Sequence, residues 1–362
     1  MSAVTREAVE ACLRQFTDPH LDQDPVSAGC LREVDIQGAR VAVRLELGYA
    51  AGLFKNGWAQ MLQMALENLD GVDSAQVKVD CVIDSHQGQA QVPALAGVKN
   101  VIAVASGKGG VGKSSMTVNL ATALAAQGLT VGIVDADIYG HSVPGLMGSD
   151  DKGPTVVDEM IMPPIAHGVR HISVGQFVEG NAPIVWRGPM LTRAIQQFLA
   201  DVYWGDLDVL FMDLPPGTGD VAITVAQLVP NAELLIVTTP QAAAAEVAER
   251  AGTIAQQTDQ KIAGVIENMS GMTMPDGTVM NIFGEGGGEQ VAERLTQLTD
   301  SDVALLGSIP LDPSLREHGD TGTPVVISEP DSPAAKAIRA VADQLKVRRE
   351  SLAGKSLNPR VK

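Results

Sequence analysis

A glycine-rich stretch at residues 106–115, with the sequence SGKGGVGKSS, contains the residue types that bind nucleotide phosphates. It follows the apolar run 101–105 and precedes a helical pattern at 116–126, which is the strand, loop and helix context that a phosphate loop requires. The glycines allow successive backbone N–H groups to point at the phosphates, and the helix N-terminus adds a favourable field. Lys113 is expected to reach the β- and γ-phosphates, and Ser114 is expected to ligate Mg²⁺. The residues predicted to bind the nucleotide here are Gly107, Lys108, Gly109, Gly110, Val111, Gly112, Lys113, Ser114 and Ser115.

Carboxylates follow two further apolar runs. Asp135 and Asp137 come after the run 131–134, and Asp213 comes after the run 209–212. Side chains just beyond the carboxyl ends of parallel strands lie on the ligand-binding edge of an open sheet. Asp213 is therefore predicted to support Mg²⁺ together with Ser114. Any one of these carboxylates could instead cap a helix, but the whole set beside a phosphate loop favours a nucleotide site.

The pattern that must position these residues is a series of short, continuous apolar runs separated by helical patterns. Continuous runs are typical of strands that are buried on both faces of a parallel sheet. We therefore predict an α/β fold: a doubly wound, mostly parallel sheet forming a P-loop NTPase domain, preceded by a small α+β domain. The predicted strands of the large domain are 101–105, 131–134, 209–212, 234–237, 262–266 and 303–306, and its helices include 114–126, 242–256, 289–298 and 334–347.

The predicted boundaries divide the chain into four parts. Residues 1–83 have the pattern of the small α+β domain, with helices at 4–16 and 58–69 and strands at 31–36, 39–47 and 75–83. Residues 84–97 are mostly polar or small and form the predicted linker. The P-loop ATPase domain is expected at 98–347. The last part, 348–362, is a basic tail that we expect to be a frayed, solvated end.

The overall composition excludes several classes of protein. A hydrophobic fraction of 45% and a charged fraction of 19% are typical of a folded globular chain. The net charge of −17 disfavours nucleic acid and anionic membranes as partners. No apolar stretch approaches the roughly 20 residues of a membrane span, and the N-terminus does not have the pattern of a signal peptide. The three cysteines are an odd number with no close pair, so we expect a cytoplasmic protein with reduced thiols.

Several motifs resemble those of one family. Lys108 is a second lysine directly after the first glycine of the loop, as in the deviant phosphate-loop ATPases of the MinD/Mrp group. DADIYGHSVP at 135–144 and DLPPGTGD at 213–220 resemble the two switches of the Mrp/ApbC-type iron–sulfur cluster carriers. Further matches are TTPQ at 238–241, ENMS at 267–270, and FG and GGG within 283–288. The resemblance covers about residues 98–347, and residues 1–80 resemble the small domain of iron–sulfur assembly factors, with DP at 18–19 as its marker.

This resemblance implies roles for particular residues. It implies a homodimer in which Lys108 reaches the partner's nucleotide like an arginine finger, although Lys108 could also be a solvated surface lysine. It implies that Asp137 orients the attacking water and that Asn268 contacts adenine, so that ATP is the expected nucleotide. With the loop residues, it makes Lys108, Lys113, Asp137 and Asp213 the predicted catalytic residues. Pro310 would open a loop that closes over the base.

The resemblance also implies an iron–sulfur cluster as cargo, delivered to apoprotein clients or exchanged with iron–sulfur assembly proteins. The family often holds its cluster with a Cys-x-x-Cys pair shortly after the ENMS stretch, but here Met274 and Gly277 stand about where those cysteines would be. A cluster generally needs four thiolates. Only Cys12, Cys30 and Cys81 are available, and each could equally be a small structural hydrophobe, so the cluster ligands stay unassigned.

Three classes of function therefore remain open. The leading prediction is an ATP-hydrolysing dimeric carrier that transfers iron–sulfur clusters to apoproteins. The first alternative is a metal-free, ATP-dependent scaffold or regulator, which the missing cysteine pair favours. The second is a positioning ATPase of the MinD/ParA kind, which would need a basic DNA-binding face or an amphipathic membrane helix. The tail has few large apolar residues, which disfavours membrane anchoring.

Overall fold

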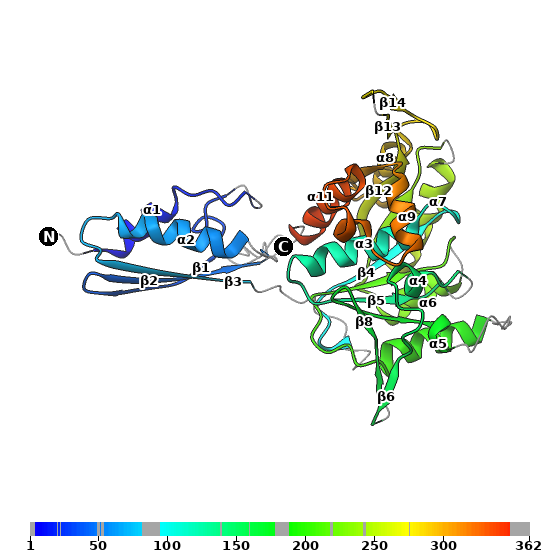
Figure 1. The fold of residues 1–362 in the computed structure, drawn as a ribbon, viewed down its shortest axis with the longest axis horizontal. Coiled ribbons are helices and arrows are strands. Elements are labelled where there is room, and N and C mark those ends of the chain that lie inside the picture. Colours follow the sequence, from blue (N-terminus) through cyan, green and yellow to red (C-terminus); the bar gives the residue numbers. More distant parts are fainter. Residues whose placement is uncertain are drawn as a thin grey trace, which may run out of the picture. The chain divides into compact units, whose positions relative to one another are not determined.

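The computed structural model describes residues 4–19, 21, 23–48, 51, 54–81, 95–137, 140–158, 160–177, 188–217, 220–241, 244–274 and 276–347. The chain divides into two compact units (Figure 1). The first is Met1–Asp84 with Leu345–Lys362, and the second is Ser85–Gln344. Most of the predicted linker at 84–97 and all of the predicted tail at 348–362 lie outside the described residues.

The first unit is a three-stranded sheet with two helices. Its elements are α1 (Arg6–Leu13), β1 (Leu31–Gln37), β2 (Arg40–Leu47), α2 (Phe54–Glu67) and β3 (Ser74–Cys81). β1 and β2 form the predicted antiparallel hairpin, and β3 lies parallel to β2 because α2 crosses between them. Alternate residues of β2 and β3 are buried in a core with Trp58, Leu62 and Leu66 of α2. α1 begins two residues later than predicted because the side chain of Thr5 accepts the Ala8 N–H and caps the helix.

The second unit contains an eight-stranded sheet in the order β15-β12-β11-β4-β10-β5-β9-β8. All neighbouring strands are parallel except β8 and β9, which are antiparallel. The chain proceeds from β4 at the centre first toward β5 and β9 and later toward β11, β12 and β15. This reversal makes the sheet doubly wound and places its switch point beside β4, where ligands bind in open α/β sheets. The strands are β4 (Val101–Ser106), β5 (Val131–Asp135), β8 (Ile165–Ala166), β9 (Val169–Ser173), β10 (Val209–Asp213), β11 (Glu233–Thr238), β12 (Ile262–Ser270) and β15 (Leu305–Pro310).

Helices cover both faces of this sheet (Figure 1). On one face α3 packs against β4, β5 and β10, and Val341 of α11 lies against Gly307 of β15. On the other face α7 packs against β4 and β11, between α6 and α8. The helices are α3 (Lys113–Ala126), α4 (Val143–Leu146), α5 (Gly188–Ala200), α6 (Asp220–Leu228), α7 (Ala244–Thr258), α8 (Gly287–Thr299), α9 (Pro313–Asp320), α10 (Val325–Ser328) and α11 (Pro333–Val347), with the 3₁₀ turn η3 (Val174–Phe177).

Two small hairpins extend from this unit. β6 (Thr155–Val157) pairs with β7 (Met160–Met162), and β13 (Met272–Thr273) pairs with β14 (Val279–Met280). The second hairpin lies between β12 and α8 and contains Met274 and Gly277, the positions where the related family often has cysteines. The side chains of Val279 and Met280 in the hairpin, and of Ile282 just after it, are exposed.

The amino edge of the central strands is fixed by one carboxylate. Asp208 precedes β10 and accepts hydrogen bonds from the backbone N–H of Thr130 and from its hydroxyl. The ammonium of Lys99, which precedes β4, lies 2.7 Å from the same carboxyl group. This edge is opposite the one that carries the phosphate loop, so the pair is structural.

Some sequence predictions of elements were wrong in detail. The strand predicted at 303–306 begins two residues later and extends to Pro310, because the N–H of Val303 is bonded to the hydroxyl of Thr296 in α8 rather than to the sheet. β9 was not predicted because Arg170 and His171 interrupt its apolar pattern. His171 is nevertheless fully buried and pairs with the hydroxyl of Ser149 at 2.6 Å.

Candidate nucleotide-binding site

The stretch between β4 and α3 lines a cavity of about 300 Å³ at the carboxyl edge of the sheet. Gly110 and Gly112 have positive φ angles, of 79° and 81°, which allow the chain to curl. The opposite wall comes from residues that follow β5 and β10. The lining residues are Ser106, Lys108, Gly109, Gly110, Val111, Gly112, Lys113, Ser114, Ser115, Asp137, Gly140, Ser142, Leu146 and Pro216. Of the residues predicted for the loop, Gly107 is buried behind this wall.

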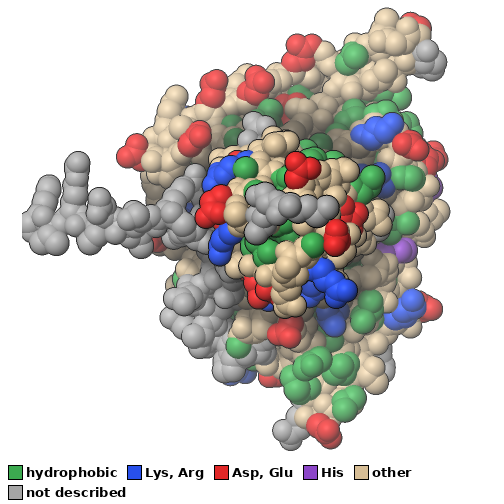
Figure 2. All heavy atoms as spheres, turned by 90° about the vertical axis from the view of Figure 1, so that its left-hand side faces the viewer, with side chains coloured by type: hydrophobic (Ala, Val, Ile, Leu, Met, Phe, Trp, Pro, Cys, Tyr) green, Lys and Arg blue, Asp and Glu red, His purple; other side chains and the backbone are tan. Residues whose placement is uncertain are grey.

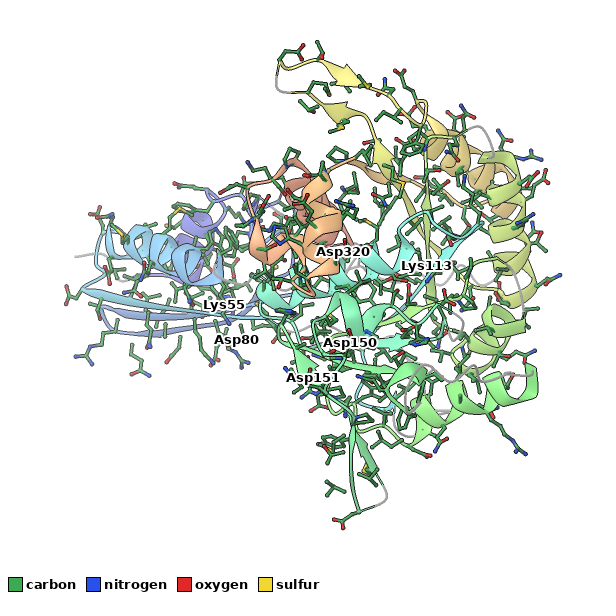
Figure 3. All side chains as sticks on the ribbon, turned by 45° about the vertical axis from the view of Figure 1, so that its right-hand side comes forward. Lys55, Asp80, Lys113, Asp150, Asp151 and Asp320 are labelled. Atoms are coloured by element: carbon green, nitrogen blue, oxygen red, sulfur yellow. The ribbon has the colours of Figure 1, made fainter. Side chains whose placement is uncertain are left out.

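Lys113 lies at the start of α3 inside the body of this unit (Figure 3), and its side chain is only 6% exposed. Its Nζ is 2.7 Å from Oδ2 of Asp213 and 3.9 Å from Oδ2 of Asp137. The hydroxyl of Ser114 also donates to Oδ2 of Asp213, and that of Thr117 donates to Oδ1 at 2.8 Å. The Asp213 carboxylate therefore contacts one ammonium and two hydroxyls of α3, and these contacts hold Lys113 and Ser114 beside the cavity.

Burial of the neighbouring carboxyl groups changes their protonation. Burial raises the pKa of Asp135 to about 8, with a further contribution from the nearby Asp213 carboxylate. Burial also raises the pKa of Asp137, although the Lys113 ammonium acts in the opposite direction. Burial therefore favours the neutral form of Asp135, which would reduce the negative charge beside a phosphate site. Its Oδ2 accepts from the hydroxyl of Ser173 at 2.9 Å, and its Oδ1 accepts the N–H of Asp137 at 3.1 Å.

The predicted first switch, 135–144, includes Asp137. Its Oδ1 accepts the N–H of Gly140 at 3.1 Å, and its side chain lines the cavity. Residues 138–139 of this switch and residues 218–219 of the second switch lie outside the described residues. The N–H of Gly217 donates to the carbonyl of Ser106, so the Pro-Pro-Gly stretch is tied to the beginning of the phosphate loop.

Asn268, which was predicted to contact adenine, is bonded to the backbone of the phosphate loop instead of lining the cavity. It is 2% exposed, does not line the cavity, and donates from Nδ2 to the carbonyl of Val111 at 2.9 Å. A Cβ added at Gly112 would lie 2.3 Å from this Nδ2, so only glycine fits there. Asn268 thus supports the loop from below, and its contact with adenine stays a prediction.

Replacing Asn268 with Ala should loosen the loop. The substitution leaves the Val111 carbonyl without its donor, which should cost about 1–3 kcal/mol of unfolding free energy. We also expect the KM for nucleotide to rise several-fold, because the loop loses its support. Denaturant unfolding and steady-state hydrolysis would measure both effects. Unchanged values of both would show that this hydrogen bond does not support the loop.

Other residues of the site were missed by sequence reasoning. Thr117 lies one helical turn after Lys113, so its spacing was an available signal. Ser173 and Arg250 come from distant segments whose approach depends on the sheet order. Gln241 belongs to the TTPQ match, but its contact with the loop was not predicted. Arg250 of α7 donates to the carbonyl of Gly107 at 3.0 Å, and Gln241 accepts from the ammonium of Lys108.

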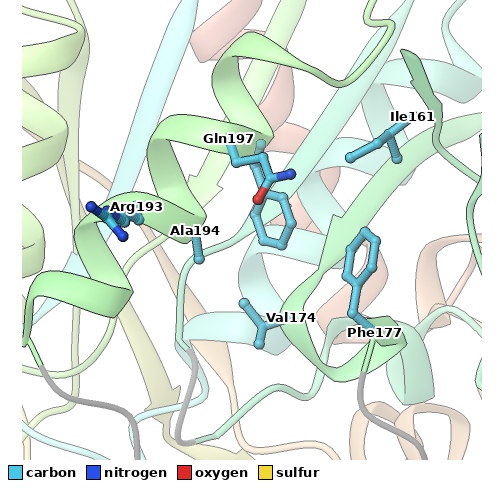
Figure 4. Close-up of a pocket in the computed structure, with 7 residues that line it drawn as sticks. Ile161, Val174, Phe177, Arg193, Ala194 and Gln197 are labelled. Carbon is cyan, nitrogen blue, oxygen red and sulfur yellow. The ribbon is translucent and has the colours of Figure 1, made fainter. Parts of the chain in front are cut away.

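A second cavity, of about 330 Å³, has a different character (Figure 4). It lies between β7, η3 and α5, and its walls are mainly apolar. Phe177 and Phe198 stack with their ring centres 5.6 Å apart. Among the described residues that line it, Arg193 is the one cation and there is no glycine-rich loop, so this set does not resemble the phosphate site. Its lining residues are Ile161, Val174, Phe177, Arg193, Ala194, Gln197 and Phe198.

The fold and the loop together define a P-loop NTPase. The family model of the NUBPL iron-transfer P-loop NTPase matches residues 97–346, and that of the iron-sulfur cluster assembly protein matches residues 6–79. The chain therefore belongs to the NUBPL iron-transfer P-loop NTPase family, with an iron–sulfur assembly domain ahead of it.

Similar proteins agree with this assignment. The chain is 53% identical to the iron-sulfur cluster carrier protein of Mycobacterium tuberculosis (strain ATCC 25618 / H37Rv) over 364 residues, which cover 97% of this chain and 95% of that protein. It is 40% identical to the protein of the same name from Synechocystis sp. over 348 residues, which cover 94% of this chain and 97% of that protein.

Among solved structures, the nucleotide-binding protein in complex with ADP from Archaeoglobus fulgidus matches with a TM-score of 0.58 and 36% identity. The match covers 68% of this chain and 96% of that chain. The septum site-determining protein MinD from Pyrococcus horikoshii OT3 matches with a TM-score of 0.51 and 23% identity, covering 70% and 97% respectively, which shows a shared fold. The predicted family, fold class and P-loop hydrolase class are thus confirmed.

Proposed function

We propose that this protein is an ATP-hydrolysing homodimer that carries iron–sulfur clusters to apoproteins. The observation that carries the proposal is the group of Lys113, Ser114 and Asp213 below a glycine-walled cavity, in a chain of the iron-transfer NTPase family. Lys113 would bind the terminal phosphates of ATP, and the backbone of residues 108–115 would cradle them.

The residues of the cavity fit a bound magnesium ion. The hydroxyl of Ser114 lines the cavity and could ligate Mg²⁺, and the buried carboxylate of Asp213, which accepts from this hydroxyl, could support the ion from behind it. The ion would neutralise charge on the phosphates when it is bound. Asp137, whose pKa is raised by burial, lines the cavity where it could accept a hydrogen bond from an attacking water.

The exposure of the first half of the phosphate loop supports the proposed homodimer. Gly109 and Gly110 are exposed and Lys108 is half-buried, so a second protomer could approach the nucleotide from this side. Lys108 would then act on the partner's nucleotide. No helix in the described part of the chain is long and apolar enough to cross a membrane.

The cargo would be bound without the cysteine pair that the family often has. Cys12 and Cys30 are buried, and burial raises the pKa of Cys12 and raises that of Cys30 to about 11, which disfavours the thiolate. Cys81, at the end of β3, is the most accessible of the three. We propose that Cys81 supplies one thiolate per protomer and that a client or assembly protein supplies the others.

Iron binding tests this proposal. We expect anaerobic reconstitution with iron and sulfide, in the presence of a thiol-bearing apoprotein, to load iron on the wild type and on Cys12→Ser, and to fail on Cys81→Ser. Iron and sulfide would be counted per dimer with and without a thiol-bearing apoprotein. Specific iron that persists in a Cys12/Cys30/Cys81→Ser triple variant would contradict cysteine ligation.

A metal-free, ATP-dependent scaffold is the second candidate. The described residues after position 94 contain no cysteine, and no group of three His, Cys, Asp or Glu side chains among all described residues could hold a metal. Absence of specific iron in every variant, with normal ATP hydrolysis, would favour this scaffold. A positioning ATPase is less supported, because the net charge of −17 disfavours a nucleic-acid partner. On the one face that Figure 2 draws, acidic and basic side chains are both present.

A further inference from the structure

Lys108 and Lys113 have opposite surroundings although they belong to the same loop. Lys113 is buried between two carboxylates. Lys108 forms no ion pair within 4 Å in the part of the chain that the structure describes, and its ammonium donates instead to Oε1 of Gln241. Gln241 is exposed and follows β11, in a different segment of the chain.

The backbone around Lys108 is held independently of this contact. The carbonyl of Lys108 accepts from the hydroxyl of Ser106 at 3.0 Å. The preceding carbonyl, of Gly107, accepts from Arg250, and a Cβ at Gly107 would lie 2.6 Å from Cγ2 of Val247. The loop therefore cannot turn as a whole to redirect Lys108, and the direction of the side chain depends on the Gln241 amide.

We propose that Gln241 is a positioning residue that holds the ammonium of Lys108 in the free protomer and releases it to the partner's nucleotide when the dimer closes. This inference rests on the proposed function of Lys108 in the dimer. An amide oxygen is a neutral acceptor, so it leaves the positive charge of the lysine uncompensated. A hydrogen bond of this kind at an exposed site is easily exchanged for one to a phosphate, whose negative charge makes it the stronger acceptor.

A graded set of substitutions tests the proposal. In Gln241→Leu the acceptor is lost, so Lys108 is free more often and ATP turnover should rise by up to about fivefold. In Gln241→Glu a carboxylate competes with the phosphate, so turnover should fall by a similar factor. The matched controls are Gln297→Leu and Gln297→Glu, because Gln297 on α8 is also exposed and also accepts from a cation, Arg294, at 3.2 Å. The Gln297 variants should leave turnover unchanged.

The decisive comparison is made in a Lys108→Ala background. If Gln241 acts through Lys108, both Gln241 substitutions should lose their effect there, measured by single-turnover hydrolysis. Equal effects with and without Lys108, or a fall in turnover of Gln241→Leu, would overturn the inference. A wild-type rate of Lys108→Ala alone would instead remove the proposed role of Lys108. The two failures can therefore be distinguished.

Discussion

Lys113→Ala should reduce ATP hydrolysis to less than about a hundredth of the wild-type rate, as loss of a preorganised charge in an active site does. The ammonium of Lys113 is the cation between Asp213 and Asp137. Without it, two buried carboxyl groups face the phosphates with no compensating charge, so nucleotide binding should weaken as well. Phosphate release and equilibrium binding of ATP would measure the two losses separately.

The same substitution could act by unfolding the protein, because breaking a buried ion pair is destabilising. The chain offers a matched control in Lys99→Ala, which removes the partner of Asp208 at the amino edge of the same two strands, 2.7 Å away. A thermal melt of both variants would separate stability from activity. We expect Lys99→Ala to remain active, and hydrolysis by Lys113→Ala near the wild-type rate would refute the assignment of the site.

Lys108→Ala should retain nucleotide affinity within about threefold and lose hydrolysis by about a thousandfold, as for the removal of an arginine finger. The physical reason is that Lys108 is not needed to balance charge in its own protomer, since it forms no ion pair among the described residues. Its charge is therefore available to another molecule. Turnover and nucleotide binding by the purified variant would test both parts of this expectation.

Mixing two inactive variants would identify the protomer in which Lys108 acts. Lys108→Ala can bind nucleotide but lacks the reaching lysine, whereas Lys113→Ala has that lysine but lacks the binding one. If Lys108 acts across the dimer, an equal mixture should recover up to about a quarter of wild-type turnover, because half of the dimers contain one complete site. No recovery, with mixed dimers shown to form, would place Lys108 in its own protomer's site.

Much of the fold could be predicted because it depends on the pattern of apolar residues and glycines within short segments. The continuous apolar strands and the glycine loop indicated a doubly wound sheet with the loop after its first strand, and β4 is that strand. The carboxylates after β5 and β10 were expected near the loop, and Asp213 lies 2.7 Å from Lys113. The carboxyl ends of parallel strands meet at one edge of the sheet, so the positions of these residues in the sequence were enough to predict that they lie near the loop.

The remaining contacts join residues that are far apart in the sequence, so no local pattern predicts them. Gln241 and Arg250 reach the loop because β11 lies next to β4, although more than a hundred residues separate them along the chain. The resemblance predicted that Asn268 contacts adenine. Its hydrogen bond to the Val111 carbonyl was not predicted, because it depends on how β12 lies relative to the phosphate loop. The burial of His171 in β9, between β5 and β8, likewise has no signal in its own segment.

The hairpin β13–β14 is held on both sides by contacts of its flanking residues, one of them to the phosphate loop. Before it, Asn268 is bonded to the phosphate loop; after it, the N–H of Gly288 donates to the buried carboxylate of Glu267 at 2.7 Å. Between these anchors the hairpin projects with exposed side chains that the site does not use. The residues of the hairpin can therefore be replaced without changing the contacts that form the nucleotide site. A hairpin with two cysteines could be grafted at 272–280 without altering the contacts of Asn268 and Glu267. The same nucleotide-binding domain would then carry a different binding site for its cargo.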